Sequence, residues 1–178
     1  MPDIYSEIIN LMNSSDTLSA STYDTENKQP FICTHPTFFM DGKFHIISTN
    51  IAKQTKFYKN KQLCSIICVG DETVKNNLFS RKRLTILCKP VHVQISDKIK
   101  IIYQEKFGIF GGGLIDVTDF EAFQLEPIEG LYFRGFGRAY NFTSDSYDVI
   151  HLKEPHKPKT GNTMAKILKK SLKDKIGA

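Results

Sequence analysis

Short stretches in which apolar and polar residues alternate run through most of the chain and predict β-strands. Polar or glycine-containing connections separate them, as expected for an antiparallel sheet. The stretch at residues 62–69 is almost continuously apolar, which is typical of a strand buried on both faces. The predicted strands lie at residues 17–23, 30–39, 43–48, 62–69, 84–95, 120–125 and 131–142, and residues 148–152 fit a last short strand.

The connections carry recognisable turn residues. Asp41-Gly42 is a strong two-residue hairpin signal, because both positions of such a turn favour a positive φ. The polar residues 24–28 predict another hairpin. Residues 126–130 predict a turn that joins the last two long strands.

Three segments follow the spacing of helices instead. Residues 3–12 repeat apolar side chains every three or four positions, which predicts a short amphipathic helix. Residues 51–58 and 98–107 predict two more. The run Gly111-Gly112-Gly113 is expected to break the third helix, because glycine is a poor helix former.

Six or seven strands with few helices predict a mainly β fold in which an antiparallel sheet is closed or sandwiched. We expect residues 1–152 to form this single domain. Residues 153–178 form a basic tail that begins with a Pro- and Gly-containing linker and continues with a helical pattern. Between Lys153 and Lys175 the tail has eight lysines and two acidic residues, so it carries the net charge of +5 and the rest is close to neutral.

Composition narrows the class of protein further. Hydrophobic residues make up 40% of the chain, which is an ordinary globular fraction. No apolar run reaches the roughly 18 residues that a membrane span needs, and the N-terminus lacks the pattern of a signal peptide. We therefore expect a cytoplasmic protein with no membrane span, and no nucleic acid as a partner.

The cysteines and two of the histidines fit structural roles. All four cysteines lie in or beside apolar runs, and no two have the C-x-x-C spacing of zinc sites, so free buried thiols are expected. His45 and His92 lie within predicted strands. The chain also lacks a phosphate-binding loop, and its triple glycine does not match a dinucleotide fingerprint.

Several short motifs recur in the order of a known family. Residues 52–60 (AKQTKFYKN) are similar to its A-x-H-T-x-N-L helix, and residues 79–85 (FSRKRLT) to its F-x-R-x-R-L-T motif. The motifs F-G, D-F, L-x-P and G-F-G-x-A then match residues 107–108, 119–120, 125–127 and 135–139. This order, over about residues 17–152, resembles the HugZ/HutZ haem-utilisation family, a branch of the FMN-binding, pyridoxamine-phosphate-oxidase-like split β-barrels. Gln54, where the family has histidine, and the triple glycine depart from the pattern.

The resemblance implies a homodimer of split barrels that binds haem at the dimer interface through a C-terminal histidine. His156 matches the position of that iron ligand, with His151 as a rival that fits the last strand better. Asp119 would orient the histidine, unless it only forms a turn. Three arginines would bind the haem propionates, unless they are ordinary solvated charges. They are Arg81, Arg83 and Arg138.

Three functions remain open on this resemblance. The first is a haem-degrading oxygenase that depends on an electron donor and serves iron acquisition. The second is an FMN-dependent oxidoreductase of the pyridoxamine-phosphate-oxidase type. In that case Lys53 and Thr55 would grip the flavin phosphate together with Arg81 and Arg83. The third is a haem storage or carrier protein without enzymatic activity.

Overall fold

The computed structural model describes residues 3–70, 80–116, 119–135, 137–143 and 150–151. The strands are β1 (Thr17–Asp24), β2 (Gln29–Pro36), β3 (Phe38–Met40), β4 (Lys43–Thr49), β5 (Cys64–Val69), β6 (Arg83–Val93), β7 (Phe120–Gly135), β8 (Arg138–Thr143) and β9 (Ile150–His151). The helices are α1 (Ile4–Asn13), α2 (Lys53–Lys59) and α3 (Asp97–Leu114).

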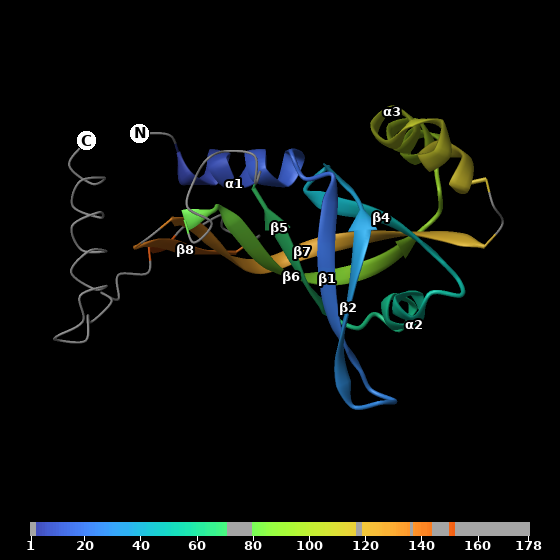
Figure 1. Cartoon of the computed structure of the whole chain (residues 1–178), viewed down its shortest axis with the longest axis horizontal. Coiled ribbons are helices and arrows are strands. Elements are labelled where there is room, and N and C mark those ends of the chain that lie inside the picture. Colours follow the sequence, from blue (N-terminus) through green and yellow to red (C-terminus); the bar gives the residue numbers. More distant parts are fainter. Residues whose placement is uncertain (1–2, 71–79, 117–118, 136, 144–149, 152–178) are drawn as a thin grey trace.

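Within these residues the nine strands form one antiparallel sheet in the order β2-β1-β5-β6-β7-β4-β3, and β8 and β9 continue from β7. The sheet curls until β2 lies against β4 (Figure 1). The expected mainly β fold with a closed antiparallel sheet is therefore confirmed. The hairpin at Asp41-Gly42 is confirmed as well, because the two residues have φ values of 53° and 75°.

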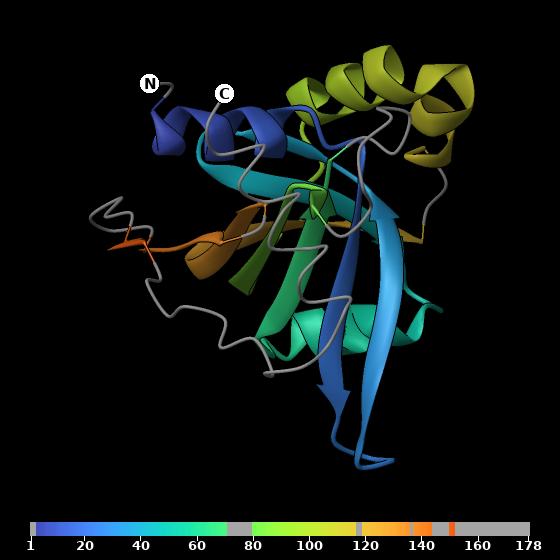
Figure 2. The ribbon, with the colours of Figure 1, turned by 60° about the vertical axis from the view of Figure 1, so that its left-hand side comes forward.

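The barrel interior holds the main core. Alternate residues of the central strands point inward and are fully buried, and α1 adds Ile8, Leu11 and Met12 to them. Figures 1 and 2 show α1 and α2 at opposite ends of the barrel, with α3 outside it. A second, smaller core lies under α3 and consists of Phe38, Ile47, Ile99, Tyr103, Ile115 and Ala122.

Side chains rather than a strand ladder close the barrel between β2 and β4. The predicted strand at residues 30–39 is interrupted at Thr37, whose hydroxyl donates to the carbonyl of His45 at 3.0 Å. Tyr103 donates to the carbonyls of Pro36 and His45, each at 3.3 Å. We call this junction the seam.

Two expectations about strands were wrong. β5 is buried on one face only: Cys64, Ile66 and Cys68 point into the core, whereas Ser65 and Val69 are exposed. Residues 126–130 are not a turn, because β7 continues through them with a bulge opposite Leu87 and Cys88. The hairpin follows Gly135 instead, and leads into β8.

The glycines that suggested a turn and a helix end have packing roles. A Cβ on Gly130 would lie 2.2 Å from the ring of Phe142, so this glycine makes room for that ring in the strand. Helix α3 breaks at Gly108, with φ of 72°, and resumes through the triple glycine. A Cβ on Gly111 would lie 2.5 Å from Cβ of Phe107, so the glycines let the second piece pack against the first.

Candidate functional site

The predicted propionate-binding arginines gather at one end of the sheet, where β6 begins and β8 follows β7. Arg83 pairs with Phe133 across β6 and β7, and its guanidinium lies 4.0 Å from the centre of the Phe133 ring. Arg81 donates to the carbonyl of Gly70. Arg138 is exposed at the start of β8. We call this group the arginine end.

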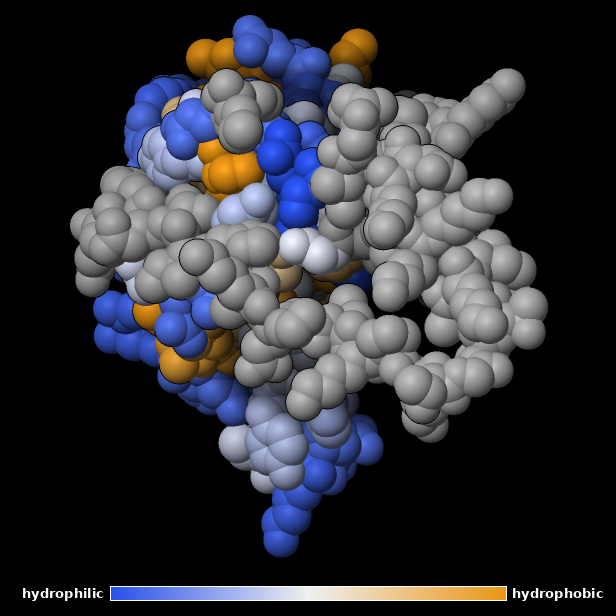
Figure 3. Space-filling view, turned by 90° about the vertical axis from the view of Figure 1, so that its left-hand side faces the viewer, coloured by the Kyte–Doolittle hydropathy of each residue, from blue (hydrophilic) through white to orange (hydrophobic). Residues whose placement is uncertain are grey.

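The carboxylate of Glu7, on α1, contacts several side chains at the arginine end. Glu7 was not among the predicted site residues. Glu7 accepts hydrogen bonds from Tyr132 at 3.0 Å, Arg134 at 2.7 Å and Lys82 at 3.3 Å. Burial raises the pKa of Glu7, but these hydrogen bonds and the nearby positive charges outweigh burial, so the pKa is lowered overall. Figure 3 looks at this end of the molecule, where strongly hydrophilic and apolar side chains lie next to one another.

Asp119 lies at the opposite end of β7. Its carbonyl accepts from the amide of Asn50 at 2.8 Å. Next to it, Lys59 donates to Asn50 at 2.7 Å and pairs with Glu121 at 2.6 Å, and His92 also contacts the Glu121 carboxylate. The hydrogen bond from Lys59 lowers the pKa of Glu121. We call this group the Asp119 end.

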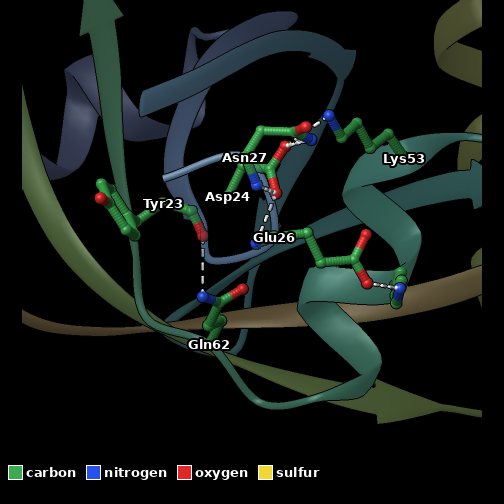
Figure 4. Close-up of polar contacts among 7 residues, drawn as sticks. Tyr23, Asp24, Glu26, Asn27, Lys53 and Gln62 are labelled. Carbon is green, nitrogen blue, oxygen red and sulfur yellow. Dashed lines mark hydrogen bonds and ion pairs between the residues drawn. The ribbon is translucent and has the colours of Figure 1, made fainter. Parts of the chain in front are cut away.

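Lys53 and Thr55 of α2 have partners within their own protomer. Lys53 pairs with Asp24, whose buried side chain also accepts from the amides of Glu26 and Asn27, as Figure 4 shows in part. The hydrogen bond from Lys53 lowers the pKa of Asp24. Thr55 is buried and donates to the carbonyl of Thr49 at 2.6 Å. Neither residue lies at the arginine end, where β6 begins and β7 ends.

Only part of the predicted iron-binding region is described. His151 pairs with Tyr140 between β9 and β8, which agrees with its expected place in the last strand. His156 lies outside the described residues. His45 is buried and stacks on Phe38 with ring centres 4.7 Å apart, and burial lowers its pKa.

A cluster of three chemically active side chains lies inside the seam. Cys33 Sγ is 3.3 Å from Nε2 of His35 and 3.5 Å from the hydroxyl of Tyr58, and His35 Nε2 is 3.1 Å from that hydroxyl. The only sequence signal was that Cys33 and His35 alternate on one strand and so share a face. All four cysteines are free, as expected.

The outer face of the sheet carries few charges. One row of neighbouring residues crosses five strands without a charged side chain: Thr34, Ser19, Ile67, Thr85 and Leu131. The next row reaches a charge only at its last member: Ile32, Ser21, Ser65, Leu87 and Glu129. Ile32 and Leu131 are 69% and 41% exposed. We call these two rows the neutral face.

The described part of the chain holds neither a metal-binding cluster nor a membrane-spanning helix. No group of three or more His, Cys, Asp or Glu side chains in the described residues is arranged to hold a metal ion. None of the helices in the same residues combines the length and apolar character that crossing a membrane requires.

Comparison with known proteins identifies the family. No protein-family model matches the chain. Heme oxygenase HutZ of Vibrio cholerae is 31% identical over 156 residues, which are 85% of this chain and 88% of HutZ. Among solved structures, Campylobacter jejuni ChuZ has a TM-score of 0.78 at 20% identity, covering 89% of this chain and 67% of ChuZ. The structure of HutZ, described as the heme storage protein from Vibrio cholerae, has a TM-score of 0.60 at 27% identity, covering 68% of this chain and 88% of that one. The expected split β-barrel is confirmed, and the chain belongs to the HugZ/HutZ family.

Proposed function

We propose that this protein is a haem oxygenase that binds haem between two copies of the chain and degrades it for iron acquisition. The likeness to HutZ carries this proposal, because it extends over 88% of that heme oxygenase. A match over 85% of this chain necessarily includes both ends of β7.

The neutral face supports a homodimer. Monomeric proteins seldom leave a broad uncharged sheet face open to water, because covering such a face lowers the free energy. A second copy related by a twofold axis presents the same face to it. Ser, Thr and aliphatic side chains such as Ile67 and Leu131 allow two sheets to pack closely there.

The two ends of β7 are too far apart for one haem to touch both within a protomer. Thirteen positions separate Phe120 from Phe133, which is about 40 Å of extended strand. Haem contacts to the arginine end and to the Asp119 end therefore come from different copies of the chain, or else only one end binds haem. We propose that they come from different copies, since a dimer interface can bring the arginine end of one copy next to the Asp119 end of the other.

Each residue then has a defined task toward the haem substrate. His156 ligates the iron as a neutral imidazole, and the Asp119 carboxylate accepts the hydrogen bond of the other ring nitrogen. Arg81, Arg83 and Arg138 neutralise the propionates through charge-assisted hydrogen bonds. Haem supplies the iron at which dioxygen is reduced, and its own macrocycle is oxidised. An electron donor is required.

The test is a haem titration followed by addition of reductant in air. We expect a Soret band that decays as an open-chain tetrapyrrole and free iron appear. His156→Ala should abolish or strongly shift the Soret band, while His151→Ala leaves it unchanged. A yellow protein with flavin absorbance and no haem affinity would refute the proposal in favour of the FMN enzyme.

Haem storage is the second candidate, because one HutZ structure is described as a heme storage protein. Storage and degradation share the binding site and differ in the fate of the haem. Stable binding without any tetrapyrrole product, under reductant and air, would support storage.

A further inference from the structure

We propose that Tyr58, His35 and Cys33 form an oxidation relay that leads one-electron oxidising equivalents away from bound haem, through the barrel core, to a thiol at the barrel edge. The relay protects the protein when activated haem fails to oxidise its own macrocycle. This proposal rests on the proposed function for its source of oxidant, but the relay can be tested without haem.

The side chains of the relay form a continuous path. At the Asp119 end, the ring of His92 lies 5.3 Å from that of Phe123, which lies 5.4 Å from that of Tyr58. The Tyr58 hydroxyl is 3.1 Å from His35 Nε2 and 3.5 Å from Cys33 Sγ. Cys33 is only partly buried on β2, an edge strand of the sheet. The path thus joins the proposed haem site to solvent.

Tyr58 is arranged to lose an electron and a proton together. Its side chain is fully buried, and burial raises its pKa far above the usual range, so a phenolate does not form. An acceptor for the phenolic proton is already in contact. His35 Nε2 lies 3.1 Å from the Tyr58 hydroxyl, and burial lowers the pKa of His35 to about 4. The imidazole is therefore unprotonated at neutral pH.

The electrons and protons balance in three steps. Haem activated by hydrogen peroxide takes one electron from Tyr58, whose proton moves to His35 Nε2. The Tyr58 radical then takes a hydrogen atom from the Cys33 thiol, which restores the phenol, and His35 releases its proton to solvent. Burial raises the pKa of Cys33, so it remains a thiol with a hydrogen atom to give. Finally a small cellular thiol donates a hydrogen atom to the Cys33 radical.

Tyr103 provides a matched control. It is also a fully buried tyrosine, but its hydroxyl donates to the carbonyls of Pro36 and His45, neither of which can take up a proton. The chain has no tryptophan, so a protein radical on an aromatic residue is readily assigned to tyrosine.

The experiment is freeze-quench electron paramagnetic resonance of the full chain with two oxidants. One arm uses the haem-free protein with light-generated ruthenium(III) tris(bipyridine), and the other uses haem-loaded protein with hydrogen peroxide. In Cys33→Ser, which keeps the hydrogen bond but removes the thiol, the tyrosyl signal should rise several-fold above wild type. Adding Tyr58→Phe should abolish that rise, and adding Tyr103→Phe should not.

A rise that survives Tyr58→Phe, or no rise in Cys33→Ser, in the light-driven arm would overturn the relay. A Tyr58-dependent signal in that arm alone would support the relay and reject haem as its source, which would count against the proposed haem site. Spin-trapped wild-type protein should carry its adduct on Cys33, as located by peptide mass spectrometry.

Discussion

His35 lies where the barrel closes, and burial lowers its pKa from 6.5 to about 4. The unfolded chain takes up a proton at this residue near pH 6.5, whereas the folded chain does so only near pH 4. Acidification between these values therefore favours unfolding. We expect the free energy of unfolding to fall by about 3 kcal/mol over this range through His35 alone. His45, whose pKa burial also lowers, acts in the same direction.

Urea denaturation from pH 7 to pH 4 measures this dependence, with His35→Gln as the comparison. The variant should be less stable at pH 7 and lose less stability on acidification. Equal losses in the two proteins would mean that His35 is not a source of the pH dependence.

Single residues also mark the limit of sequence analysis. Family motifs indicated that Arg81 and Arg83 belong near a site, and the two residues do lie at one end of the sheet. No motif indicated that Lys53 is paired with Asp24, because that contact joins a hairpin to a helix nearly thirty residues away. Spacing along the chain carries no information about such partners.

Among the secondary-structure elements, α1 is held on the barrel by Glu7. Glu7→Gln removes the charge that faces Lys82 and Arg134 and leaves their hydrogen bonds weaker. We expect the free energy of unfolding to fall by about 1–3 kcal/mol. Glu105→Gln, on the exposed surface of α3, should change it by less than about 0.5 kcal/mol. Thermal and urea unfolding measure both, and a Glu7→Gln variant as stable as the control would remove Glu7 as an anchor.

Most of the elements were predictable, since alternation located most strands to within a few residues, but it merged β2 with β3 and misplaced the boundary between β7 and β8. The errors at β7 and α3 have one cause. The sequence does not distinguish a glycine that bends the backbone, as Gly108 does, from one that makes room for a neighbouring side chain, as Gly130 does for Phe142. Only the packing partner distinguishes these uses, and it lies elsewhere in the chain.

For the whole molecule, the neutral face makes association testable. Leu131→Lys places a charge on the β7 side of this face, in the row it shares with Thr85 and Ile67. Because burying an unpaired charge is costly, we expect a monomer with an intact barrel and much weaker haem binding. Ile109→Lys, at a strongly exposed position on α3, is the control. Sedimentation velocity at micromolar concentration distinguishes monomer from dimer, and a Leu131→Lys dimer would place the interface elsewhere.

The haem site is the part of the molecule that one chain's sequence predicts least. Its residues were named from family motifs, but Arg83 lies beside one end of β7, opposite Phe133, and Asp119 precedes the other end. How they meet depends on a twofold arrangement, and hydrophobic patterning within one chain does not specify the partner's orientation.

The seam gives the barrel a place to open without global unfolding. β6 has a ladder on both sides, whereas β2 and β4 are joined across the seam by Thr37 and Tyr103. Losing those few side-chain bonds costs far less than breaking a ladder. Amide protons of β4 that face the seam should therefore exchange with deuterated solvent well before those of β6. The barrel would thus open along the seam while its strand ladders stay intact. For a planar molecule that binds near the seam, re-formation of the seam contacts, rather than diffusion, would be the slowest step of binding.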